Sequence, residues 1–159
     1  MNPEESAMLK RGYRNTKVVF FAFAGSIFCY GFLAFLLSQT GGETASRSDV
    51  GALRMMLWGL SIAGVALAKP VGNLILRMKP AAGATRSGDP VAGLVSKLVG
   101  STIVSGALNV AAAVYGLLIF LLTKSWVDFF VLAFSSLVGL AICLPRFNEW
   151  ESWVRERGF

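Results

Sequence analysis

The sequence predicts an all-α integral membrane protein, a four-helix bundle that forms one transmembrane domain over residues 1–159. Hydrophobic residues make up 55% of the chain and charged residues only 15%, and the mean hydropathy is +0.62. The charges cluster between long apolar runs. A membrane-crossing helix needs about 20 consecutive apolar residues, so the apolar runs suffice for about four spans and leave no separate soluble domain.

We expect the spanning helices at about residues 18–38, 54–77, 95–123 and 126–144. The first apolar run is longer than the core of a signal peptide and is followed by no small-residue cleavage pattern, so we expect it to be retained. The loop at 39–52 is short and polar, and the middle connector, KPAAGATRSGDP, is rich in Pro and Gly.

The third and fourth helices are predicted to form a tight antiparallel hairpin, because only Lys124 and Ser125 separate them. Pro145 is expected to end the fourth helix, since proline lacks the N–H that continues the helical hydrogen bonds. In the tail, 145–159, the apolar residues share one helical face. We therefore expect an amphipathic cytoplasmic segment at the level of the lipid headgroups.

The basic residues predict the orientation. Only Arg47, Arg54 and Lys124 lie at the end of the bundle opposite the termini. The others lie at the end that the N-terminus, the middle connector and the tail share: Lys10, Arg11, Arg14, Lys17, Lys69, Arg77, Lys79, Arg86, Lys97, Arg146, Arg155 and Arg157. By the positive-inside rule both termini are cytoplasmic. We expect a multi-pass protein of the bacterial inner membrane.

Four residues are predicted to lie at the interface with lipid: Lys69, Arg77, Trp150 and Trp153. Lys69 is a basic residue inside an apolar run, about 12 Å along the helix from Arg77. Its alkyl chain can carry the amine to the interface or to a lipid phosphate. A functional cation within the membrane is the alternative.

The two halves of the chain resemble each other in sequence. The first helix contains YGFLAFLLS from Tyr30 and the third YGLLIFLLT from Tyr115. The second contains SIAGVALAKP from Ser61 and the fourth SLVGLAICLP from Ser136. The order and direction agree, so we predict two tandem helical hairpins related as parallel repeats.

The third helix carries the richest polar stripe, in which Ser101, Ser105, Asn109 and Gly116 recur at helical spacing. Small and hydroxyl-bearing residues of this kind predict a helix-packing seam. The alternative is a ligand or ion site around Asn109 and Tyr115. All nine acidic residues lie outside the spans or at their ends, so no carboxylate is expected at mid-depth to carry a proton or sodium ion.

Several classes of function are disfavoured by composition. Histidine is absent, which removes His-ligated haem and most zinc and copper sites. No nucleophile–base pair or phosphate-binding loop is recognisable, so we expect no enzyme, no catalytic residues, no metal and no cofactor. The net charge of +6 is expected to serve anionic lipid headgroups and not nucleic acid.

The segment from Gly59 to Leu122 resembles the helical hairpin of rotary ATPase proteolipids (c subunits). The first part, GLSIAGVALAKPVGNLILRMKP, has a small-residue helix followed by a basic loop with Arg77 and Pro80. The second part, GALNVAAAVYGLLIFLL, is similar through Ala107, Leu108, Tyr115, Gly116 and Leu117. The resemblance implies close helix packing in an assembly. The position matching the family's ion-binding carboxylate is Val110, beside Asn109, so ion exchange is not implied.

These observations favour a non-catalytic small polytopic membrane protein, a structural or accessory subunit. Its expected partners are the lipid bilayer and other membrane protein subunits, either copies of itself in a homo-oligomer or a larger complex. The alternative is a small transporter or a proteolipid-like ion-conducting oligomer with a polar site near Asn109 and Tyr115.

Overall fold

The computed structural model describes residues 3–39, 47–78, 90–144 and 146–155. Over these ranges the chain is helical and contains no strand. Four helices contain stretches long and apolar enough to cross a membrane, which confirms the predicted all-helical class with four membrane-spanning candidates. The helices are α1 Pro3–Gln39, α2 Arg47–Arg77, α3 Pro90–Thr123, α4 Trp126–Cys143 and the short α5 Phe147–Arg155.

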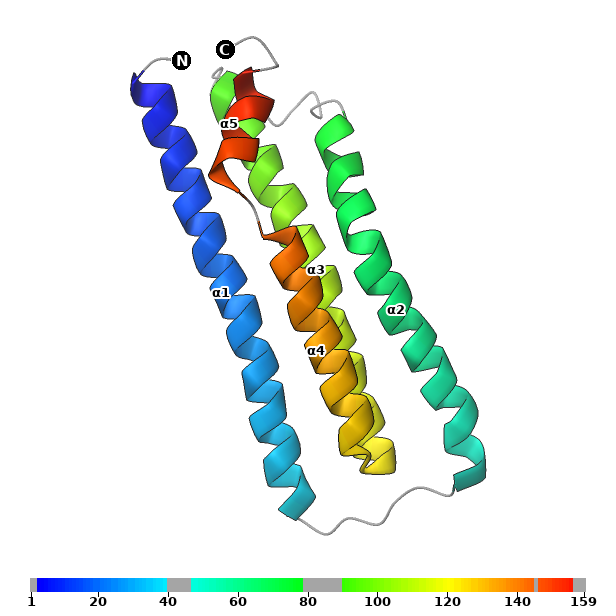
Figure 1. The fold of residues 1–159 in the computed structure, drawn as a ribbon. Helices are drawn as coiled ribbons and strands as arrows, with labels where there is room; N and C mark the ends of the chain where they lie inside the picture. The colour runs from blue at the N-terminus through cyan, green and yellow to red at the C-terminus, as the bar shows by residue number, and fades with distance from the viewer. Residues whose placement is uncertain (1–2, 40–46, 79–89, 145, 156–159) are drawn as a thin grey trace.

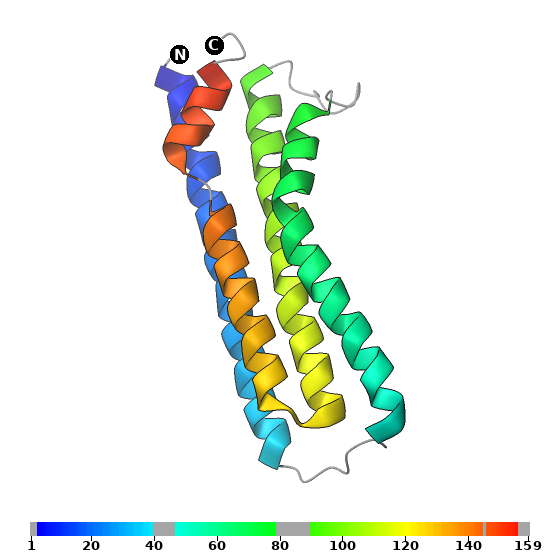
Figure 2. The ribbon, with the colours of Figure 1, turned by 45° about the vertical axis from the view of Figure 1, so that its right-hand side comes forward.

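Helix α3 is the centre of the bundle. Helices α1, α2 and α4 all pack on α3, whereas the described parts of α1 and α2 share almost no contact with each other. In Figure 1, α1 and α2 therefore stand on opposite sides of α3 and α4. Figure 2 shows α2 beside α3 and α1 beside α4 in the turned view. The bundle is thus organised around one central helix and does not pair α1 with α2 as it pairs α3 with α4.

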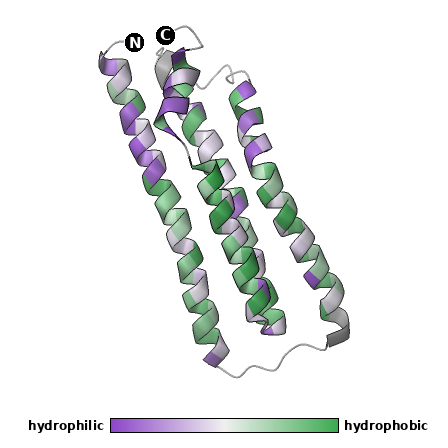
Figure 3. Cartoon of the chain, viewed as in Figure 1, coloured by the Kyte–Doolittle hydropathy of each residue, from purple (hydrophilic) through white to green (hydrophobic). Residues whose placement is uncertain are grey.

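The helices begin earlier than the apolar runs do. Helix α1 starts at Pro3 and not near residue 18, α2 at Arg47 and not near 54, and α3 at Pro90 and not near 95. At 37 residues, α1 is about 55 Å long, well beyond the roughly 30 Å of bilayer hydrocarbon. Polar residues at its start therefore continue the helix outside the apolar zone (Figure 3). The cluster from Lys10 to Lys17 lies on α1 and does not precede it.

Lys124 and Ser125 form the connection between α3 and α4, as the sequence predicts. Lys124 adopts a left-handed backbone with φ of 54°, which ends α3, and its side-chain amine donates to the carbonyl of Leu37 at 3.3 Å. Ser125 is the N-cap of α4 and accepts a hydrogen bond from the backbone N–H of Asp128 at 3.5 Å. At the other end α4 stops at Cys143, and Leu144 is extended, as is usual before a proline.

The C-terminal helix α5 folds back onto the bundle. Its buried Trp150 and Val154 cluster with Leu9 of α1 and Leu98 of α3. The Trp150 ring lies 5.6 Å from that of Tyr13, edge to face. The tail is amphipathic as expected, but its apolar face is turned toward protein. Trp150, expected at the lipid interface, is only 4% exposed, because α1 and α3 extend far enough to cover it.

Close contacts fix α4 against α3. The Ser136 hydroxyl donates to the backbone carbonyl of Asn109 at 2.6 Å. One turn later Gly139 faces the Asn109 side chain, where a Cβ atom would overlap the amide oxygen. Glycine is therefore required at this position for the two helices to approach each other.

Gly139→Ala should destabilise the fold by about 1–3 kcal/mol, because the fully buried Asn109 side chain would be pushed out of its place. The measurement is the free energy of unfolding of the purified protein in detergent. Gly25→Ala is the matched control, since no atom lies within 4 Å of a Cβ built at Gly25. Equal stability of the two variants would contradict the close contact.

Candidate functional site: a polar seam and a basic cavity

The predicted polar stripe of α3 divides between two neighbouring helices. Ser105 faces α2, where its hydroxyl donates to the carbonyl of Ala68 at 2.8 Å. Gly72 of α2 lies against the same hydroxyl, where a Cβ atom would overlap it. Gly116, by contrast, faces α4, since a Cβ there would lie 3.1 Å from the Cβ of Leu132. The stripe therefore works as two consecutive packing seams.

Asn109 lies where the two seams meet and is 0% exposed. Its side-chain amide donates to the carbonyl of Ser105 at 2.8 Å and to the sulfur of Cys143 at 3.6 Å. Among the described residues its amide oxygen has no hydrogen-bond partner. Tyr115 is half-buried. It follows Asn109 by six residues, so the two side chains leave α3 about 120° apart around the helix axis. The structure does not bring Asn109 and Tyr115 into one site.

A buried carboxylate holds α2 to α4 at the end opposite the termini. Asp128, in the first turn of α4, is 2% exposed. It accepts from the Arg54 guanidinium at 2.8 Å and from the Trp58 indole N–H at 3.2 Å. Asp128 lies at a span end as the sequence predicts, but its burial was not predicted. The available signal was the opposite charge of Arg54 at the same end of the bundle.

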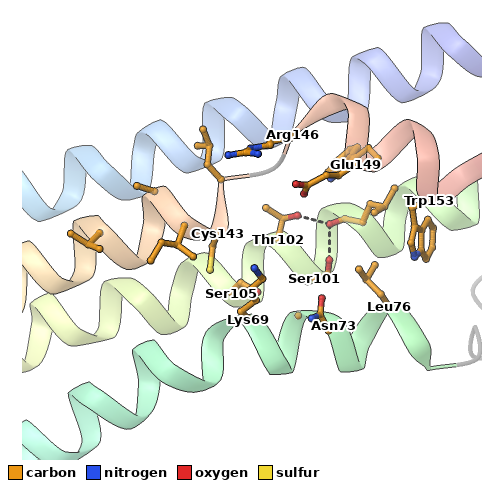
Figure 4. Close-up of a pocket in the computed structure, with 17 residues that line it drawn as sticks. Lys69, Asn73, Leu76, Ser101, Thr102, Ser105, Cys143, Arg146, Glu149 and Trp153 are labelled. Atoms are coloured by element: carbon orange, nitrogen blue, oxygen red, sulfur yellow. Dashed lines mark hydrogen bonds between the residues drawn. The ribbon is translucent and has the colours of Figure 1, made fainter.

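A cavity of about 830 Å³ opens at the other end, between α2, α3, α4 and α5 (Figure 4). Five residues singled out in the sequence line it together: Lys69, Ser101, Ser105, Trp150 and Trp153. Arg77, the other predicted interfacial residue, is exposed in the last turn of α2 and does not line the cavity.

Other lining residues were not anticipated in this role. Arg146 and Glu149 approach from the chain after α4, opposite Lys69 and Asn73 of α2 (Figure 4). On α3 the hydroxyl of Thr102 donates to the carbonyl of Leu98 at 2.7 Å. A cavity role for Arg146 depends on the tail folding back, because Arg146 follows the end of α4 at Cys143 and the extended Leu144.

A second cavity, of about 470 Å³, lies between α1 and α4. Its lining is almost wholly apolar and largely aromatic, and includes Phe28, Phe35, Phe130 and Phe134. It offers no group for polar recognition or chemistry, so the cavity at the α5 end is the better candidate site.

No group of three or more potential metal ligands occurs within the described part of the chain. Comparison with protein-family models, curated proteins and solved structures finds no match to this chain.

Asp128→Ala should lower the free energy of unfolding by about 1–3 kcal/mol, because it removes two hydrogen bonds that join α2 to α4. Asp128→Asn should cost less, since it keeps an acceptor for Trp58. The control is Glu151→Ala, which breaks an exposed ion pair with Arg155 within α5 and should cost less than about 0.5 kcal/mol. Thermal unfolding in detergent measures all three, and equal losses for Asp128→Ala and Glu151→Ala would refute the assignment.

Proposed function

We propose that this protein is a non-catalytic membrane subunit that associates laterally with another transmembrane helix through the outer face of α2. The observation that carries the proposal is the exposure of α2. Only 6% of its spanning window is buried within the chain, against 50% for α3. The partner is a second copy of this chain or a larger membrane complex.

The outer face of α2 has the composition of a helix-contact surface. Gly59, Ala63 and Ala66 are all exposed and recur at spacings of four and three residues, which puts them on one face. Small residues let a second backbone approach closely, and in lipid such packing replaces the hydrophobic driving force. A Cβ at Gly59 would meet no atom within 4 Å, so that position is open to a partner.

The resemblance to proteolipid hairpins is in keeping with this proposal. Helices α2 and α3 pack extensively on each other, and the close approach at Gly72 is of the kind that the resemblance implies. Val110, which matches the family's carboxylate position, is 8% exposed and cannot hold a proton. We therefore favour an assembly role over ion conduction.

The tandem repeat remains a prediction. In its favour, the glycines of the Ser-x-x-Gly pairs in α2 and α4 both face α3, Gly64 at Leu108 and Gly139 at Asn109. A Cβ on Gly64 would lie 3.4 Å from the Leu108 carbonyl, and Gly139 meets Asn109. Against it, α1 and α2 do not close into a hairpin as α3 and α4 do.

A transporter with its site near Asn109 and Tyr115 is less well supported. Asn109 is enclosed by protein, and Tyr115 points to a different side of α3. Neither residue lines the cavity at the α5 end.

Native mass measurement after extraction in mild detergent should show the chain in a complex heavier than the monomer. Gly59→Leu should return it to the monomer, because the added side chain occupies the surface that the partner helix needs. Gly25→Leu is the matched control, a glycine equally open to its surroundings on α1, and should leave the complex intact. A monomeric wild-type protein would contradict the proposal.

We further propose that both termini are cytoplasmic, in a bacterial inner membrane. The start of α1, the end of α2 and α5 all lie at one end of the bundle (Figure 1). That end carries most of the described basic residues, as the positive-inside rule requires of the cytoplasmic side. A reporter active only in the cytoplasm should therefore function at either terminus, and a reporter active only outside should function at residue 43. The reverse pattern would exclude this orientation.

A further inference from the structure

The cavity at the α5 end contains two cations without an acidic partner. Lys69 belongs to the spanning stretch of α2, and Arg146 follows α4. In the part of the chain that the structure describes, the two ion pairs are Arg54 with Asp128 and Arg155 with Glu151. Lys69 and Arg146 belong to neither pair, although Glu149 lines the same cavity.

A cation in this position needs a counter-ion. A charged side chain within the apolar zone is costly unless it reaches the interface or meets an opposite charge. Lys69 lies about 12 Å along α2 from Arg77, at the helix end. No carboxylate of the described chain is bonded to it, so the Lys69 amine either extends to the interface or meets an opposite charge that a ligand or solvent supplies.

The cationic groups suit a phosphate. Lysine presents a compact charge with three donors, and arginine presents a planar fork that matches phosphate oxygens. The hydroxyls of Ser101 and Thr102 already donate to the carbonyl of Leu98 (Figure 4). Their remaining lone pairs can accept hydrogen bonds from hydroxyl groups of a ligand.

The remaining walls suit an acyl chain. Val138, Ala141 and Ile142 of α4 line the cavity and are exposed on the outside of the bundle. In a membrane these positions face lipid, so the cavity is open to the bilayer along α4. Trp153 and the buried Trp150 of α5 border its other end.

We propose that this cavity binds a phosphate-bearing anionic lipid. Lys69 and Arg146 contact the phosphate, and an acyl chain lies along Val138 and Ile142 of α4. The same two cations would also bind free inorganic phosphate, but the apolar, membrane-facing wall of the cavity favours the lipid. The bound lipid brings a negative charge to the two cations and fills the space between α2 and α4.

The test is native mass spectrometry of the full chain in detergent, titrated with phosphatidylglycerol or phosphatidylcholine. The wild-type protein should bind one phosphatidylglycerol per chain at least about tenfold more tightly than phosphatidylcholine. The double change Lys69→Ala with Arg146→Ala should remove this preference. Lys69→Arg should retain the preference, because it keeps the positive charge. Comparison with this variant separates an effect of lost charge from an effect of impaired folding.

The matched control is Lys10→Ala with Arg14→Ala, which removes two exposed cations of α1 at the same end of the bundle. This variant should bind phosphatidylglycerol as the wild-type protein does. Equal binding of the two lipids by the wild-type protein, or equal losses in both double variants, would overturn the proposal. Displacement of bound lipid by millimolar inorganic phosphate would assign the site to the free anion and overturn the lipid assignment.

Discussion

The packing of three long helices onto α3 is the constraint on which the rest of the structure depends. Lipid chains are as apolar as leucine, so burial from water cannot drive helices together inside a membrane, and close backbone contact has to do so. Helix α3 meets this requirement with Ser105 toward α2 and with Asn109 and Gly116 toward α4. Its neighbours contribute glycines at the contact points, Gly72 and Gly139. The polar groups at these contacts mostly bond to protein, because hydrocarbon offers them no partner.

Charged side chains are paired differently at the two ends of the bundle. At the end of the bundle that contains the α3–α4 turn, Asp128 is buried and bonded to Arg54 and Trp58. These bonds join α2 to α4 without an external ligand. At the opposite end Lys69 and Arg146 line an open cavity, with no such partner among the described residues. In the first arrangement the opposite charge comes from the chain itself. In the second arrangement the described chain supplies no such charge, which leaves the two cations of the cavity available to a bound anion.

Helix α5 creates that cavity by docking beyond the end of α4. Its apolar face lies against Leu9 of α1 and Leu98 of α3, and both helices extend past the apolar zone to reach it. The break after Cys143 turns the chain so that Arg146 and the two tryptophans of α5 border the space between α2 and α4. The long polar start of α1 thus supports the tail, and the tail in turn completes the wall of the site.

The sequence by itself determined the four spans, the two-residue turn at Lys124 and Ser125, and the amphipathic character of the tail. These are local properties, set by the length of apolar runs, by the spacing of residues along a helix and by the chemistry of turns. Only the tertiary structure decided that α3 is central, that Asp128 is buried, that Trp150 faces protein, and that Lys69 and Arg146 border one cavity. Each of these depends on which faces of distant helices meet. Apolar periodicity cannot specify that choice in a membrane, because the side of a helix that faces lipid and the side that faces protein are both apolar.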